Sequence, residues 1–220
     1  KDTGYDMLLT VNNHAGDTMG DGMIRTIETV RAAGLASLGT QLPGEKRYSV
    51  VDINGIKVGM VAYSWAYGIS GNGFSLNGLA YIKDEGQANY FSKKNPDKLY
   101  NELKPILEGM KEDGAEATMI FIHWGEEYEI KENAAEDKMA QKLCDLGFDV
   151  IIGGHPHVVQ PMALLQSTEN PEHKTYCLYS LGNAVSNQRA GISDKFSRYT
   201  ESGVLLSVTF EKYSDGKVYV

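Results

Sequence analysis

Apolar residues fall in short continuous runs that alternate with stretches of helical spacing. The runs are too short for buried helices and predict strands at residues 5–11, 117–123 and 149–153. Between them, apolar positions recur every three or four residues and predict helices at residues 23–31, 99–110 and 139–146. Gly34 and Gly147 follow two of these helices, where glycine commonly ends a helix. Strands and helices that alternate in this way are typical of a layered α/β domain.

The end of the chain is mostly strand. Residues 175–181 and 203–210 predict strands, and a turn at residues 214–216 leads to a last one. Nearer the start, Asn54-Gly55 separates residues 49–53 from 57–63 and predicts a β-hairpin. We therefore expect mixed β-sheets within a single domain over residues 1–220.

Proline and polar stretches mark the remaining boundaries. Asn95 is expected to cap the helix over 99–110, with Pro96 as its first residue and Pro105 producing a kink. Three loops lack clear periodicity, and such long loops are either functional or surface decoration. They lie at residues 64–95, 166–174 and 188–202.

The charge balance excludes some classes of protein. The 220 residues carry 21 Lys and Arg against 29 Asp and Glu, a net charge of −8, which disfavours binding to nucleic acid. No run of about 18 apolar residues predicts a membrane-spanning helix, and we find no signal peptide. Because the chain opens with Lys-Asp-Thr-Gly, we expect it to be part of a longer protein that carries any signal or anchor. Cys144 and Cys177 are expected to be buried thiols rather than a disulfide or a metal pair.

Four of the five histidines follow predicted strands. His14 comes after residues 5–11, His123 ends the run 117–123, and His155 and His157 follow 149–153. Because ligands bind at the carboxyl ends of strands in open α/β sheets, these rings are expected to converge. His173 is expected to be solvated in a polar loop.

His155-Pro156-His157 is the sharpest local motif. Pro156 favours an extended backbone at His155, which would direct both rings to one face. Gly153 and Gly154 allow the chain to approach a ligand closely. Imidazole nitrogens suit zinc, iron or manganese, so the motif predicts a metal site. The alternative is a pair of loop histidines without a ligand.

Asn13 and His14 are a weaker signal. The Asn13 carbonyl oxygen suits a divalent cation, and His14 is placed to protonate a leaving group. The alternative is that Asn12 and Asn13 form a turn or cap, and that Asp17 caps the following helix.

Acidic and aromatic residues follow His123. The three glutamates could contact a substrate or orient a ligand, or they could form a solvated loop. The two aromatic rings are as consistent with packing in the core as with stacking on a substrate. These residues are Trp124, Glu126, Glu127, Tyr128 and Glu129.

Four segments together resemble bacterial capsule-synthesis proteins of CapA type, over nearly the whole chain. The segments are VNNHAGD (11–17), IHWGEEY (122–128), GGHPHVVQP (153–161) and YSLGN (179–183). This family is associated with poly-γ-glutamate capsule and is related to calcineurin-like metallophosphoesterases. The resemblance implies a layered α/β sandwich of metallophosphoesterase type, with mixed β-sheets and a dinuclear metal site.

The resemblance also assigns roles to residues. It implies that Asn13, His123 and His155 bind one metal ion, that His157 binds the other, and that His14 meets the leaving group as the catalytic acid. The residues it places near the substrate or behind the ligands are Asp17, Glu127 and Tyr128, and Asn183 and Arg189 are further candidates for that role.

The chain departs from the family at its start. Related proteins begin earlier, with segments that supply carboxylates, so the N-terminal strands and the acidic ligands are expected to be missing here. Without an anionic bridge, two divalent ions about 3.5–4 Å apart repel strongly. We therefore expect at most one ion (Mn, Zn or Fe) and no activity from the isolated chain. Ala184 and Ser186 replace bulky family residues, so that wall of the site is expected to differ.

Two functions stay open, with a vestigial site as a third reading. The first is a metal-dependent hydrolase acting on a phosphoester or an amide-linked polymer. The second is a non-catalytic module that handles an anionic polymer or assembles capsule with other capsule-synthesis proteins. By resemblance either would act at the extracellular face of the bacterial membrane. Metal ions or the side chains of Lys83, Lys93, Lys94 and Arg189 would bridge the acidic protein to a polyanion. The open edge of residues 5–11 predicts dimerisation.

Overall fold

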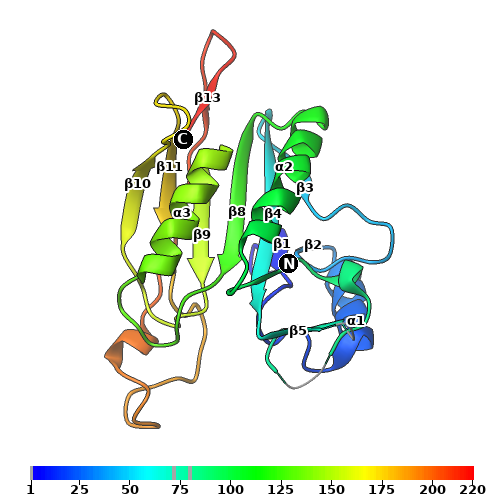
Figure 1. Ribbon diagram of the computed structural model, residues 1–220, viewed down its shortest axis with the longest axis vertical. Helices are drawn as coiled ribbons and strands as arrows, with labels where there is room; N and C mark the ends of the chain where they lie inside the picture. Colours follow the sequence, from blue (N-terminus) through cyan, green and yellow to red (C-terminus); the bar gives the residue numbers. More distant parts are fainter. Residues whose placement is uncertain (1, 71–72, 79–80) are drawn as a thin grey trace. The chain divides into compact units, whose positions relative to one another are not determined.

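The computed structural model describes residues 2–70, 73–78 and 81–220, and these form two compact units (Figure 1). The first unit comprises Lys1–Val51 and Gly59–Gly114, and the second comprises Asp52–Val58 and Ala115–Val220. Both contain helices and strands, which confirms the α/β class. The single domain over residues 1–220 stays a prediction.

The first unit opens with a β-α-β segment. Strand β1 (Met7–Leu9) pairs in parallel with β2 (Ala36–Leu38), and helix α1 (Met19–Ala32) connects them and buries Met23 and Ile27. The strand predicted over residues 5–11 is thus shorter and only half-buried, because β2 alone pairs with it in the described part of the chain. Dimerisation through the other edge of β1 stays a prediction.

Helix α2 (Asp97–Glu112) is the second helix of this unit, and it packs against β7 (Tyr90–Ser92). Its N-cap is Pro96, without a side-chain cap, so the prediction of Asn95 as the cap was wrong by one residue. The loop predicted over residues 64–95 contains regular elements. They are β5 (Gly68–Ser70), β6 (Gly73–Ser75), the 3₁₀ turn η1 (Glu85–Gln87) and β7.

The predicted hairpin is confirmed. Strands β3 (Ser49–Ile53) and β4 (Ile56–Ala66) are joined by Asn54 and Gly55, whose φ angles are 54° and 89°. Two successive positive φ angles define the turn whose twist matches that of paired strands.

The second unit contains a mixed sheet in the order β10-β11-β9-β8 (Figure 1). Strands β8, β9 and β11 are parallel, and β10 pairs antiparallel with β11. Helix α3 packs on β10 and β11; Asn133 and Glu136 form a capping box at its start, and Gly147 ends it at φ 99°. The bounds are β8 (Ala117–His123), α3 (Ala134–Leu146), β9 (Val150–Gly154), β10 (Met162–Gln166) and β11 (Lys174–Leu178).

Two predictions for the end of the chain need correction. The strand predicted over 175–181 ends at Leu178, and residues 204–210 form no strand in the described part of the chain. In the described part of the chain, their backbone pairing is limited to the preceding bridge from Gly203 to Gly182 and a hydrogen bond from the Val204 amide to the Leu181 carbonyl at 2.8 Å, and Leu205 is fully exposed. The terminal hairpin is confirmed as β12 (Glu211–Lys212) and β13 (Val218–Tyr219), and the loop 188–202 contains the turn η2 (Arg198–Glu201).

Burial of the remaining side chains follows ordinary rules. Cys144 and Cys177 are buried free thiols, as predicted, and burial raises the pKa of both.

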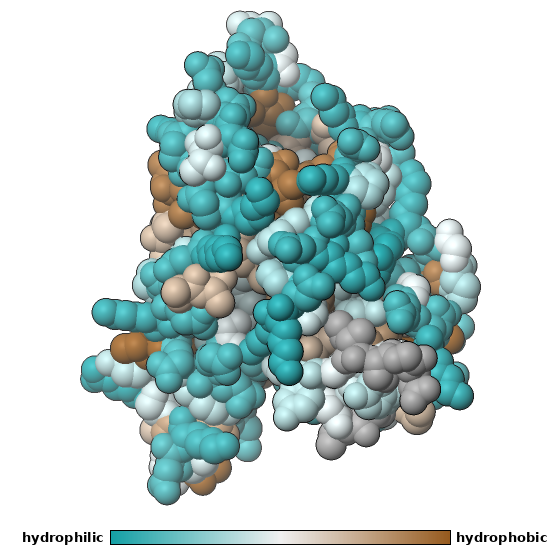
Figure 2. Space-filling view, viewed as in Figure 1, coloured by the Kyte–Doolittle hydropathy of each residue, from teal (hydrophilic) through white to brown (hydrophobic). Residues whose placement is uncertain are grey.

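The face drawn in Figure 2 is mostly hydrophilic, with scattered apolar side chains. Among the described residues, none of the helices is both long and apolar enough to cross a bilayer.

Candidate functional site

Three of the predicted site residues gather at the carboxyl ends of β8 and β9. The register pairs His123 with Gly154, so His155 follows directly beside His123. The ring centroids of His123 and His155 are 4.7 Å apart, and those of His155 and His157 are 6.2 Å apart. His155 is only 8% exposed, whereas His123 and His157 are half-buried. These three residues are called the histidine cluster below.

The backbone of the cluster differs from the predicted extended form. His155 has φ 104° and His157 has φ 62°, and Tyr128 in the facing loop has φ 71°. Such angles cost about 1–3 kcal/mol at a non-glycine residue and concentrate at functional sites. The contact from the Tyr128 amide to the Pro156 carbonyl, at 2.8 Å, holds the two loops together. Tertiary contacts therefore outweigh the local preference that Pro156 imposes.

Asn183 orients the ring of His157. The Asn183 amide nitrogen lies 3.2 Å from the carbonyl of His157 and 2.9 Å from that of Thr200, and an amide nitrogen only donates. The Asn183 carbonyl oxygen must then face His157 Nδ1, at 2.9 Å, and accept its proton. This assignment leaves the lone pair of a neutral His157 on Nε2, which lies 4.0 Å from a Glu127 oxygen.

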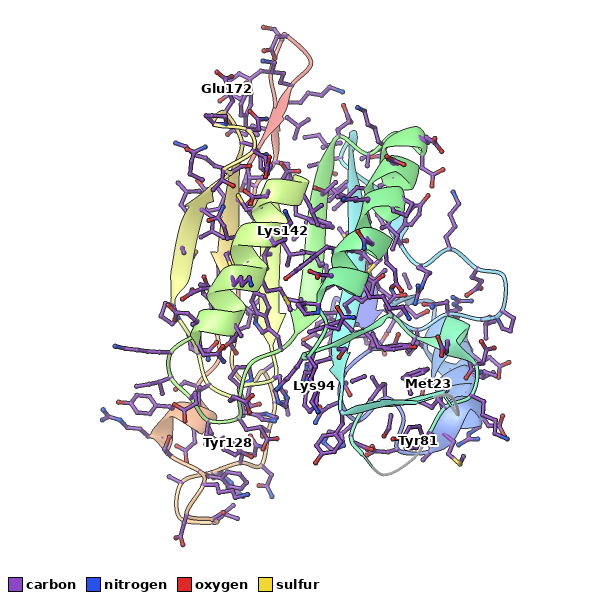
Figure 3. The ribbon with its side chains drawn as sticks, in the orientation of Figure 1. Met23, Tyr81, Lys94, Tyr128, Lys142 and Glu172 are labelled. Atoms are coloured by element: carbon purple, nitrogen blue, oxygen red, sulfur yellow. The ribbon has the colours of Figure 1, made fainter. Side chains whose placement is uncertain are left out.

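Tyr128, which Figure 3 labels, stacks on the His157 ring. The two rings stack with centroids 5.8 Å apart and planes 22° apart, and Phe196 meets Tyr128 edge-on at 5.7 Å. The Gln188 amide donates to the Tyr128 hydroxyl at 3.4 Å. Burial, and then the nearby Glu127 charge, raises the pKa of Tyr128, so its hydroxyl stays protonated at neutral pH.

Trp124 packs in the protein interior next to the histidine cluster. This agrees with the interpretation of its ring as a packing residue rather than one that stacks on a substrate. The ring is 2% exposed, and its Nε1–H donates to the carbonyl of Tyr179 at 2.9 Å. Gly153 fits against both groups, since a Cβ there would lie 1.9 Å from the Tyr179 oxygen and 2.4 Å from Trp124 Nε1. The glycine is needed for this close packing.

Asn13, His14 and Asp17 lie in the first unit, in the turn between β1 and α1. His14 Nδ1 is 2.8 Å from an Asp17 oxygen, and the Asn77 amide donates to the other Asp17 oxygen. The Asn12 side chain accepts from the His14 amide at 2.8 Å, which confirms the turn at Asn12. Thr18, not Asp17, occupies the N-cap of α1, so the alternative role of Asp17 as a cap was wrong.

The remaining predicted residues lie at the surface of the second unit or are held by other contacts. Arg189 is exposed, and its nearest polar partner is the Asn187 side chain at 2.9 Å. Glu126 and Glu129 are also exposed. His173 is not solvated as predicted, because it is half-buried with Nε2 3.1 Å from the Phe148 carbonyl.

Two glutamines were missed by the sequence analysis. Gln160 is buried and donates to the carbonyls of Glu129 and Lys131, which fixes the acidic loop. Gln188 accepts from Asn183 at 3.1 Å and donates to Tyr128. Both lie in irregular segments, where no periodicity indicates which side chains point inward.

The donor chemistry of the cluster suits a metal, but its arrangement is not a formed metal site. Imidazole nitrogens are common ligands of zinc, iron and manganese. Yet over residues 2–70, 73–78 and 81–220, no three His, Cys, Asp or Glu side chains are grouped so that they could hold a metal ion.

Fold and site together define an α/β protein with histidines gathered at the carboxyl edge of a mixed sheet. Residues 1–188 match the family model described as "Bacterial capsule synthesis protein PGA_cap". The chain belongs to this family.

Two curated relatives are similar to the chain. It is 27% identical over 190 residues to "Capsule biosynthesis protein CapA" of Bacillus anthracis, covering 86% of this chain and 42% of that protein. It is 27% identical over 193 residues to "PGA biosynthesis protein CapA" of Bacillus subtilis (strain 168), covering 86% and 44%. The chain thus spans less than half the length of either relative.

Two solved structures are also similar. A hypothetical protein from Thermus thermophilus aligns with a TM-score of 0.46 and 14% identity, over 86% of this chain and 58% of that one. The sulfate thiohydrolase SoxB from the same species, solved with glycerol, aligns with a TM-score of 0.47 and 15% identity, over 82% and 28%.

Proposed function

We propose that the histidine cluster is the metal-dependent hydrolytic site of a capsule-synthesis protein. The observation that carries this proposal is the packing of three imidazoles at one sheet edge, two of them on left-handed backbone. Strained backbone and a largely buried histidine are maintained only where the surrounding contacts enforce them. Family membership supports the link to capsule synthesis.

The chain's own residues prepare this site for a ligand. Asn183 holds the proton on His157 Nδ1 and directs Nε2 toward Glu127. Tyr128 stacks on the same ring and limits its rotation. A partner that fixes the remote nitrogen is typical of metal-binding histidines.

His123, His155 and His157 would hold a single divalent ion, zinc, manganese or iron, only after drawing together into a tighter group than the described residues show. When bound, such an ion lowers the pKa of a water ligand and stabilises negative charge on the substrate. The roles that the resemblance gives Asn13 as a ligand and His14 as the acid stay predictions. The contact between His14 Nδ1 and Asp17 would fix the ring orientation that an acid needs.

The proposed substrate is a phosphoester or an anionic polymer such as poly-γ-glutamate, handled at the extracellular face of the membrane. A net charge of −8 repels a polyanion over the whole protein. Cations bound at the site, or exposed bases such as Arg189, would offset that repulsion locally.

The second candidate is a non-catalytic module that binds capsule polymer, alone or with other capsule-synthesis proteins. The observation that favours it is that, over the described ranges, His, Cys, Asp and Glu side chains form no ready group of three for a metal.

The test is hydrolysis of bis-p-nitrophenyl phosphate by a chain extended at its N-terminus, in the presence of zinc or manganese. We expect a metal-dependent rate that falls at least 100-fold in His155→Ala, because that ring lies close to both of the others. His173→Gln is the matched control, since His173 contacts the Phe148 carbonyl instead. Equal rates for wild type and His155→Ala would contradict the hydrolase. Saturable polymer binding without turnover would favour the second candidate.

A further inference from the structure

The loop over residues 125–132 meets the histidine cluster with a strained backbone. Tyr128 in this loop has φ 71°, and its ring stacks on that of His157 with centroids 5.8 Å apart. A Glu127 oxygen lies 4.0 Å from His157 Nε2. Because a non-glycine residue keeps such a φ angle only where surrounding contacts enforce it, the loop must be held in place by residues outside it.

Gln160 provides two of the hydrogen bonds that hold the loop. Its Nε2 donates to the carbonyl of Glu129 at 2.9 Å and to that of Lys131 at 3.1 Å. The Tyr128 amide donates to the Pro156 carbonyl at 2.8 Å. These bonds join the loop, at Tyr128 and at the residues that follow it, to the segment that carries the end of the cluster.

The partners of the Gln160 side chain fix the orientation of its amide group. Carbonyl oxygens only accept hydrogen bonds, so the amide nitrogen must face them. The opposite orientation would place Oε1 against two other oxygens. Oε1 is buried without a hydrogen-bond partner in the described part of the chain. The two bonds to the loop therefore maintain an arrangement that leaves one buried polar atom unsatisfied, which is uncommon in folded proteins.

The backbone around Gln160 is anchored to the segment that follows β11. The Gln160 amide donates to the Ser180 carbonyl at 3.1 Å, and the Tyr179 amide donates to the Pro161 carbonyl at 3.1 Å. Gln160 itself is only 4% exposed. Its side chain thus extends from a fixed backbone and ties the loop to it.

We propose that Gln160 is a positioning residue for the histidine cluster. It holds the loop over residues 125–132 so that the Tyr128 ring stacks on His157, and it acts on the cluster through this ring. The proposal deepens the proposed function, on which its importance for hydrolysis rests. The stacking itself can be measured without metal or substrate, so the two proposals can fail separately.

The first experiment measures nuclear Overhauser effects between the ring protons of Tyr128 and His157 in the chain without metal. Wild type should show them because the rings stack. Gln160→Met keeps a side chain of similar length but cannot donate, so it should lose most of their intensity. Gln160→Ala, which leaves space rather than a new apolar group, should lose them as well.

Gln141→Met is the matched control. Gln141 also donates from its side-chain amide to a loop carbonyl, that of Gln166 at 3.0 Å, which lies beside the start of β11. The cluster lies at the carboxyl ends of the parallel strands, so this variant should keep the Tyr128–His157 effects. Thermal unfolding followed by circular dichroism verifies that each variant is folded.

A double-mutant cycle on zinc affinity tests whether Gln160 acts through Tyr128. Gln160→Met should weaken zinc binding on the order of 10-fold, as the loss of a supporting partner does. In a Tyr128→Leu background the same substitution should have a much smaller effect, because the ring that it positions is already absent.

Hydrogen exchange in the unsubstituted chain adds a measurement that needs no variant. Both Nε2 protons of Gln160 should exchange slowly, since both are bonded in a buried site. The proposal is overturned if these protons exchange rapidly, if Gln160→Met keeps the Tyr128–His157 effects, if Gln141→Met loses them equally, or if the two substitutions act additively on zinc affinity. A wild type that shows the stacking but neither binds zinc nor hydrolyses the ester would contradict the proposed function instead.

Discussion

Replacing Gly153 with alanine should destabilise the second unit by about 3 kcal/mol or more, because overpacking of this severity forces the backbone to move. The new methyl carbon would lie 1.9 Å from the Tyr179 carbonyl oxygen and 2.4 Å from the Trp124 nitrogen. The hydrogen bond between those two groups would break or shift. Urea unfolding followed by tryptophan fluorescence measures the loss.

Gly154→Ala is the matched control for this substitution. A Cβ at Gly154 would meet only His123 Nδ1, at 4.0 Å, which is ordinary contact. We expect a change within about 0.5 kcal/mol, as for substitutions away from packed features. If the Gly153→Ala and Gly154→Ala variants are equally stable, the close packing of Gly153 against Tyr179 and Trp124 is wrong.

The second large effect is expected on zinc affinity. His155→Ala should weaken zinc binding by a factor on the order of 100 or more, because it removes the central ring of the cluster. Asn183→Ala should weaken it by about 10–100-fold, since it removes the partner that orients His157 but none of the three rings. Competition with a chromophoric chelator measures both constants.

His173→Gln is again the control and should bind zinc as wild type does. Its ring contacts the Phe148 carbonyl and Thr175, outside the cluster. If the zinc affinity of His155→Ala equals that of the wild type, the histidine cluster is not the metal site.

The sequence predicts the position of the cluster because strand positions depend on a local pattern. The apolar run 117–123 matches β8, and parallel pairing with β9 brings His123 beside His155. The hairpin at Asn54-Gly55 is equally local, since both residues tolerate positive φ.

The conformation of His155-Pro156-His157 was not predictable in the same way. Pro156 favours extended backbone before it, but the left-handed φ of His155 occurs where the Tyr128 amide binds the Pro156 carbonyl. That partner is distant in the sequence, and no pattern in either segment indicates the contact. Gln188 and Gln160 escaped prediction for the same reason.

For residues 203–210, the sequence predicts a strand that the described part of the chain does not contain. Their apolar composition is that of a strand, and Leu206, Val208 and Phe210 are half-buried as alternation predicts. A strand also needs a neighbour, and in the described part of the chain only Gly203 forms a bridge. The alternation of apolar and polar residues within a segment does not indicate whether another strand lies beside it.

The central claim is that three histidine rings share one ligand, and nuclear magnetic resonance of the ring nitrogens tests it most directly. During zinc titration of the ¹⁵N-labelled chain, the resonances of His123, His155 and His157 should shift together and reach saturation at one equivalent. His157 should bind through Nε2, with Nδ1 still protonated against Asn183. Rings that shift independently, or a His157 that binds through Nδ1, would contradict the account.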